Sequence, residues 1–180
     1  MSAPPRTGHD GKQAAFVLAA VAALLAIPAL IANRVPERET LVEAGTRLAV
    51  SAPGEEPDTV TFAGVDGWAQ RPTGDPATAV VRSPEETVLI VTVANGVTDF
   101  PAAADWRLEV LALQGFEGVF DGGQVQTPNG FAGPTCQGDG QAGVCAIVGK
   151  DNLVVTLALS GRTASFDQLA PVLETLAVEQ

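Results

Sequence analysis

The residue types that most enzymes use for acid–base or nucleophilic chemistry are scarce in this chain of 180 residues. The single histidine is His9, close to the N-terminus, and tyrosine is absent. A Ser-His-Asp triad, a Cys-His pair or a histidine-based zinc site would need a residue that the C-terminal part lacks. We therefore expect no catalytic residues, no cofactor-binding residues and no metal ligands, and we interpret the protein as a non-enzyme.

The other residues with reactive side chains lie in turn sequences. Lys150 could form a Ser–Lys dyad, but its place in Gly-Lys-Asp-Asn favours an ordinary turn. The carboxylate pairs Glu55/Glu56 and Glu85/Glu86 each lie beside a proline. General acid–base catalysis needs a carboxylate in a cleft with a shifted pKa, and exposed turn residues do not provide that environment.

Three aspartates of the C-terminal part have side chains that could bind calcium. Asp121, Asp139 and Asp151 are separated along the C-terminal part, and none lies in a segment that resembles a calcium-binding loop. The sequence therefore predicts no metal site at these residues.

Cys136 and Cys145 are the only cysteines. An even number of cysteines in an exported domain indicates a disulfide, and these two lack the C-x-x-C spacing of a redox-active pair. We predict a structural bridge between them, with redox activity as the alternative.

The charge of the chain is strongly negative. It has 21 acidic and 10 basic residues, and the part after residue 44 has 17 acidic and 6 basic residues, so this part accounts for the whole net charge of −11. Such a surface repels nucleic-acid phosphates and anionic lipid headgroups. We expect no nucleic-acid partner.

One apolar segment is long enough to cross a membrane. Ala14–Ala32 contains 19 residues without a charge, about 28 Å of helix against a hydrocarbon core of about 30 Å. The alternative is a cleaved signal peptide, but cutting after Ala32 or Ala29 would place Leu30 or Ile27 at the −3 position, where a small residue is preferred. We therefore expect an uncleaved signal anchor.

This anchor predicts the organisation of the chain. We expect a cytoplasmic tail over residues 1–13, a transmembrane helix over 14–32, a charged stalk over 33–45 and an extracytoplasmic domain over 46–180. Basic residues flank both ends of the apolar segment equally, so the positive-inside rule does not decide the orientation. The cysteine pair and the acidic excess favour a single-pass cell-membrane protein with its N-terminus inside.

Strand patterns occupy both halves of the domain. The expected strands are Thr59–Phe62, Ala77–Arg82, Thr87–Ala94, Val144–Val148 and Leu153–Leu159. The turn sequences between them predict two hairpins, and the near-continuous apolar run Val88–Val93 indicates a central strand. The stretch Gly122–Gly143 is rich in Gly, Gln, Pro and Asn, and we interpret it as loop with short strand pieces.

Two helices complete the pattern. One is expected between Pro101 and about Gly115, because Trp106, Val110 and Leu113 recur at i, i+4 and i+7 and would form its apolar face.

The final helix begins near Ser165. Ser165 and Gln168 have the spacing of a capping box, and Phe166, Leu169, Leu173 and Leu176 line one face. Pro171 lies within this span, so either the helix starts later or it bends. The order of elements predicts an α+β domain, an antiparallel sheet covered by two helices, preceded by the transmembrane helix.

The order of elements resembles the PsbP-like α/β fold, a family that includes the LpqN-type lipoproteins of cell envelopes. The likeness spans about Thr59–Ala177. It includes the Gly67-Trp68 turn, the hairpin into Thr87–Ala94, the Trp106–Leu113 helix, the Gly-rich hairpin and the Ser165–Leu176 helix. The chain differs from those lipoproteins in its transmembrane anchor. The resemblance implies a non-catalytic domain that docks on other proteins or envelope components.

These observations lead to two hypotheses of function. The first is a membrane-anchored extracytoplasmic interaction module, an accessory or stabilising subunit of a cell-envelope or membrane protein complex. The alternative is a binding protein or sensor for a small envelope molecule. An exposed apolar patch over a filled core would favour the first hypothesis, and an apolar-lined pocket would favour the second.

Overall fold

A computed structural model describes residues 15–22, 24, 39–54 and 57–179 of the chain. The chain divides into two compact units, residues 1–37 and residues 38–180. In the first unit, residues 15–22 are helical with exposed apolar side chains such as Phe16 and Leu18. The rest of the predicted anchor, apart from the exposed Leu24, lies outside the described residues, as does the tail. No helix among the described residues is long and apolar enough to cross a membrane.

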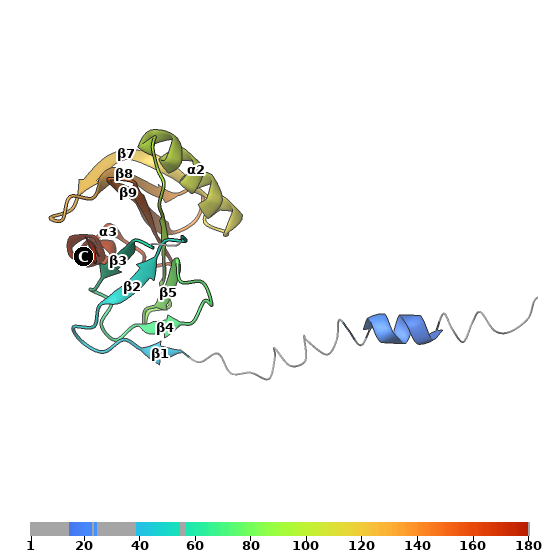
Figure 1. The fold of residues 1–180 in the computed structure, drawn as a ribbon. Coiled ribbons are helices and arrows are strands. Elements are labelled where there is room, and N and C mark those ends of the chain that lie inside the picture. The colour runs from blue at the N-terminus through green and yellow to red at the C-terminus, as the bar shows by residue number, and fades with distance from the viewer. Residues whose placement is uncertain (1–14, 23, 25–38, 55–56, 180) are drawn as a thin grey trace, which may run out of the picture. The chain divides into compact units, whose positions relative to one another are not determined.

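The second unit is an α+β domain built on a large antiparallel sheet, as the sequence predicted (Figure 1). The strands of this eight-stranded sheet are, in spatial order, β1 (Thr40–Leu41), β4 (Ala69–Arg71), β5 (Thr78–Arg82), β6 (Val88–Ala94), β10 (Leu153–Ser160), β9 (Gly143–Lys150), β8 (Ala132–Gly138) and β7 (Gly118–Gln126). A three-stranded sheet has the order β11 (Ala177–Val178), β3 (Thr59–Phe62) and β2 (Leu48–Ser51). The helices of this unit are α2 (Phe100–Leu113) and α3 (Phe166–Thr175).

The two predicted hairpins are present and lie side by side. Strand β6 pairs with β5 on one side and with β10 on the other, and β10 also pairs with β9. The central position predicted for Val88–Val93 is therefore confirmed. The β9–β10 turn contains Asp151 with φ +54°, a conformation that Asp tolerates better than most residues.

The middle of the large sheet is buried on both faces, as β10 shows. Its odd-numbered residues, Leu153 through Leu159, belong to a core shared with α3 and the small sheet. On the opposite face, Val154 and Ala158 belong to a second core beneath α2. Strand β10 therefore reads as continuously apolar because apolar layers cover both of its faces.

Helix α3 packs against β3 and β9 and begins at Phe166, so the prediction that it starts here is confirmed, with Pro171 inside it. The predicted capping box is wrong, because the Ser165 side chain makes no cap hydrogen bond and Gln168 Oε1 is buried without a partner. The helix instead lies close to the loop after β3. A Cβ atom on Gly64 would lie 2.8 Å from Pro171 Cβ, so a side chain there would force the two elements apart.

The segment Gly122–Gly143, predicted as loop with short strand pieces, forms longer strands than expected. The segment contributes to β7 and β8, which pair with each other, and β8 also pairs with β9. Glycine has a low strand propensity, so composition alone favours a loop. Several strand glycines, among them Gly133, have an aromatic ring where a side chain would otherwise lie.

Two phenylalanines use this space, one at each end of α2. A Cβ atom on Gly133 would lie 2.8 Å from Phe100 Cζ, and a Cβ atom on Gly149 would lie 2.6 Å from Phe100 Cε2. At the other end, Phe116 Cε1 would lie 2.9 Å from a Cβ atom on Gly118. Both rings are thus seated directly on the backbone of the sheet, which fixes α2 across β7, β8 and β9.

Candidate interaction surface

Helix α2 has clear signals at both ends. Asp99 caps the N-terminus, and its Oδ1 accepts a hydrogen bond of 3.2 Å from the Ala102 N–H. Pro101 occupies the first turn, where its missing N–H is not needed. After the helix, Gly115 takes φ +90°, which ends the helical path. The predicted helix is therefore confirmed to within one or two residues.

Arg107 attaches the middle of α2 to the sheet. Thr92 and Thr156 face each other across β6 and β10. The guanidinium of Arg107 donates from Nε to Thr156 Oγ1 at 2.9 Å, and it also donates to Thr92 Oγ1. Among the described residues no carboxylate forms an ion pair with it, and burial lowers the pKa of Arg107 from its ordinary value. Its role here is to hold the helix on the two hydroxyls.

The apolar face of α2 lies elsewhere than predicted. The buried helix residues are Ala104 and Leu111, with Leu108 partly buried in the same core. Trp106 is 57% exposed and Leu113 is 88% exposed. Helical spacing places these two on the side of α2 that faces away from Leu111. The prediction that they form the core-facing stripe is therefore wrong.

We call Trp106, Val110 and Leu113 the α2 stripe. These three residues do share one side of the helix, as their spacing predicts, but α2 is apolar on more than one side. The sequence cannot rank these sides because both contain large apolar residues. Two apolar sides on one helix indicate an exposed apolar surface, because the sheet beneath the helix can cover only one of them.

The α2 stripe has acidic neighbours on one side and a base on the other. Glu109 is exposed and lies three residues after Trp106 and four before Leu113, and the exposed Asp105 lies four residues before Glu109 on the same side. On the opposite side, the Arg107 guanidinium carbon lies 6.0 Å from the centroid of the Trp106 ring, within the range of a cation–π contact. The indole is therefore partly oriented by a side chain that is itself attached to the sheet.

A groove of about 350 Å³ lies between the first half of α2 and strands β7 and β8. We call it the α2–β7 groove. Its walls combine two aromatic rings, two prolines, a carboxylate and an amide, contributed by Phe100, Pro101, Ala104, Asp105, Phe120, Gln124 and Pro134. Apolar walls with a few polar groups are the usual composition of a small-molecule site.

A bulge in β7 shapes one wall of this groove. Phe120 pairs with Cys136 and Gln124 with Pro134, so β7 advances four residues while β8 advances two. The bulge is held by Asp121, whose Oδ1 accepts hydrogen bonds from Gly123 N–H at 2.8 Å and from Thr135 Oγ1 at 2.5 Å. The bond from Thr135 is the main cause of a lowered pKa at Asp121. Phe120 and Gln124 lie one on each side of the bulge, and both line this wall of the groove.

Cys136 and Cys145 are joined by a disulfide that lies beneath α2. They are directly opposite each other on β8 and β9, with Cα atoms 4.8 Å apart, and both are fully buried. The bridge belongs to the same core as Phe120 and the buried side of α2. It is therefore placed to hold β8 to β9 under the groove.

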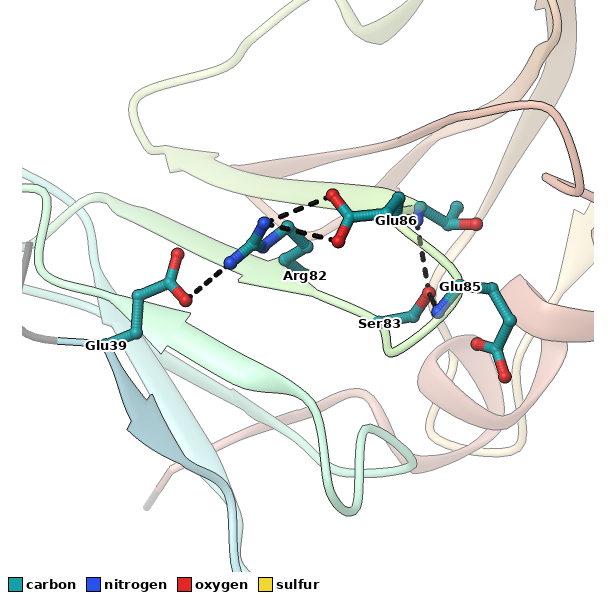
Figure 2. A network of polar contacts seen from close by, with 6 residues as sticks. Glu39, Arg82, Ser83, Glu85 and Glu86 are labelled. Atoms are coloured by element: carbon teal, nitrogen blue, oxygen red, sulfur yellow. Dashed lines mark hydrogen bonds and ion pairs between the residues drawn. The ribbon is translucent and has the colours of Figure 1, made fainter.

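A charged cluster lies at the far edge of the large sheet, and Figure 2 shows it. Arg82 donates to Glu39 at 2.7 Å and to Glu86 at 3.1 Å. The hydrogen bond to Glu39 is the main cause of the raised pKa of Arg82. The next turn is fixed by Ser83 Oγ, which accepts hydrogen bonds from the Glu85 and Thr87 N–H groups. Glu85 and Glu86 are thus turn residues, and Glu86 is an ion-pair partner.

The other residues considered from the sequence are not brought into one site. The Lys150 Nζ lies 5.8 Å from the centroid of the buried Phe131 ring. Asp121 is in the β7 bulge, Asp151 is in the β9–β10 turn, and the backbone N–H of Asp139 donates to Glu117. Glu55 and Glu56 lie outside the described residues. Within the described ranges, no three His, Cys, Asp or Glu residues are grouped so that they could hold a metal ion.

Comparison of the chain with protein-family models, with curated proteins and with solved structures finds no match. The resemblance to the PsbP-like family stays a prediction. The α2 stripe and the α2–β7 groove are the two surface features of α2 that could bind a partner or a ligand.

Proposed function

We propose that the protein is a membrane-anchored extracytoplasmic interaction module, an accessory subunit that docks on another envelope or membrane protein through the α2 stripe. The observation that carries this proposal is the exposure of Trp106 and Leu113 on a helix whose opposite side is already buried. Exposed apolar patches on a domain with a filled core are characteristic of protein interfaces.

Trp106 is the residue of the stripe that is typical of an energetic hot spot, and Arg107 lies beside it. Trp and Arg are the residue types that contribute most often to binding energy at interfaces. Trp106 is held beside Arg107, which is hydrogen-bonded to the sheet, so little side-chain freedom remains to be lost on docking. Covering Leu113 alone would stabilise a complex by about 2 kcal/mol.

Charge identifies the chemistry of the partner. Asp105 and Glu109 flank the stripe, and the net charge of the chain is −11. We expect the partner to have an apolar pocket bordered by Lys and Arg. The opposite charges of the two surfaces would increase the association rate and the specificity of the complex. A second copy of this chain, an anionic membrane surface and a nucleic acid would all repel it.

The anchor would increase the local concentration of the domain. If residues 14–32 cross the membrane, the short stalk keeps the stripe near other membrane proteins. Tethering by a short linker corresponds to an effective concentration of about millimolar. Binding alone is then sufficient for function, and we propose no catalytic step.

The test uses the full-length protein in its native membrane. After cross-linking and affinity capture have identified a partner by mass spectrometry, its recovery is compared between Leu113→Ser and Leu41→Ser. Both leucines are exposed, Leu113 by 88% and Leu41 by 69%, but Leu41 lies on β1, outside the stripe. We expect Leu113→Ser to lower the apparent affinity by about tenfold or more, and Leu41→Ser to leave it unchanged. Equal recovery with both variants would refute docking through the stripe.

The α2–β7 groove favours the alternative, a binding protein or sensor for a small envelope molecule. Its volume of about 350 Å³ is within the range of small-ligand sites. The two functions share Asp105 at their border but otherwise use different residues, so variants at Leu113 and at Phe120 test them separately.

A further inference from the structure

We propose that the α2–β7 groove binds an organic cation, meaning an ammonium or guanidinium group carried on a small apolar body. The proposal rests on the alternative function above and names its class of ligand. It does not depend on docking through the α2 stripe.

The walls of the groove match both parts of such a ligand. Phe100 and Phe120 provide aromatic surface and Pro134 adds an apolar wall. Aromatic faces attract a cation through their quadrupole, and the attraction increases as the cation leaves water. A neutral apolar molecule would also fit these walls. The choice between a cationic and a neutral ligand therefore depends on the charged group in the groove.

Asp105 is that charged group. Among the described residues that line the groove it is the only charged one, and Gln124 adds an amide oxygen that can accept a hydrogen bond. Among the described residues, no hydrogen bond or ion pair occupies the Asp105 carboxylate. A cation would gain a charge-assisted hydrogen bond there. An anionic ligand would meet this carboxylate within a domain that already carries an excess of acidic residues.

The groove is held in shape before any ligand arrives. The Phe100 ring is seated on Gly133 and Gly149, so it has little room to move. The hydrogen bonds to Asp121 hold the bulge between Phe120 and Gln124, which both line one wall. A site whose walls are fixed in this way loses little conformational entropy on binding.

The experiment measures binding to the full-length protein in a neutral detergent by NMR, with three ligands of nearly the same shape. They are 2-phenylethylammonium, neutral 2-phenylethanol and anionic phenylacetate. We expect chemical-shift changes at groove residues with 2-phenylethylammonium and binding at least about tenfold weaker with the other two ligands. Affinity for the cation should fall as salt is raised from about 0.05 M to about 0.5 M.

Two variants test the residues. Asp105→Asn keeps the shape and removes the charge, and we expect it to weaken binding of the cation by about tenfold while leaving 2-phenylethanol unchanged. Glu109→Asn, the matched control on the same helix, should bind the cation as the wild type does, because Glu109 does not line the groove. Equal affinity for 2-phenylethylammonium and 2-phenylethanol, unchanged binding in Asp105→Asn, or no shift at groove residues up to about 10 mM ligand would overturn the proposal.

We expect the cation to be a free molecule, and a Lys or Arg side chain of the docked partner is the other outcome of the test. Phe120→Leu distinguishes these sources, since it alters the groove without touching the α2 stripe. If Phe120→Leu weakens both the cation and partner capture, a partner side chain fills the groove. If only binding of the cation weakens, the ligand is a free molecule. Loss of partner capture in Leu113→Ser with the cation still bound would separate the docking function from this site.

Discussion

Arg82 donates from Nη2 to Glu39 Oε2 at 2.7 Å, and this ion pair joins the beginning of the domain to the end of β5. Glu39 directly precedes β1, a strand of only two residues at the edge of the large sheet. So short a strand has few ladder hydrogen bonds, and the ion pair adds a second attachment for this segment.

The first prediction concerns this attachment. Glu39→Gln should speed hydrogen exchange at the amides of β1 and β4 and leave the exchange of the β6–β10 amides unchanged. High salt should have a similar effect on the wild type, because exposed ion pairs are screened. Glu43→Gln serves as the control, since Glu43 forms no such pair with Arg82. Unchanged exchange at β1 in Glu39→Gln would show that the short strand is sufficient by itself.

The second prediction concerns Arg107 and the two threonines beneath it. Arg107→Met retains an apolar stem but removes the donor from the buried hydroxyls of Thr92 and Thr156. We expect the free energy of unfolding to fall by about 1–2 kcal/mol in urea titrations. The exposed Arg162→Met should change it by less than about 0.5 kcal/mol.

A triple variant decides the cause of that loss. Adding Thr92→Val and Thr156→Val to Arg107→Met removes both acceptors, and replacing both partners of a hydrogen bond by apolar groups is nearly neutral. The triple variant should therefore regain most of the lost stability. A further loss would mean that the hydroxyls have other buried partners.

The third prediction concerns the disulfide. Cys136→Ser/Cys145→Ser should lower the free energy of unfolding by about 2.5–3 kcal/mol, because the bridge closes a loop of about ten residues in the unfolded chain. The fold and partner capture should persist under native conditions, and reduction of the wild type should lower stability similarly. Stability that is retained while function is lost would instead indicate that the pair has a redox role.

The fourth prediction follows from Asp121. Its pKa is lowered from an ordinary value of 3.8, first by the hydrogen bond from Thr135. A carboxylate with a depressed folded-state pKa stabilises the fold fully above the unfolded value, and this stabilisation is lost as the pH falls through the folded-state pKa. Asp121→Asn should therefore be less stable than the wild type at neutral pH. The difference in stability should disappear as the pH falls below 3.8 and through the lowered folded-state pKa of Asp121.

NMR titration of the Asp121 carboxyl checks the cause directly. Thr135→Val removes the hydrogen bond, so it should raise the pKa of Asp121 towards its ordinary value. An unchanged pKa in Thr135→Val would assign the shift to the Gly123 backbone instead.

Local patterns were sufficient to predict much of the domain. The alternation in Thr59–Phe62 and the apolar runs on either side of their turns predicted β3 and both hairpins. Pro101 and Gly115 bounded α2. These signals are readable because strand alternation, turn residues and helix ends depend on neighbours within a few positions.

The side of α2 that is buried and the strands in the Gly-rich segment depended on the tertiary structure. Trp106 and Leu111 are both large and apolar, and only the sheet beneath α2 decided that Leu111 is covered and Trp106 is not. Gly133 and Gly149 indicate a loop until the Phe100 ring is placed on them, since the ring supplies the packing that a side chain would otherwise supply. Sequence by itself determined which segments form helices and hairpins, because those preferences are local. The α2 stripe and the α2–β7 groove were decided by contacts between residues far apart in the chain.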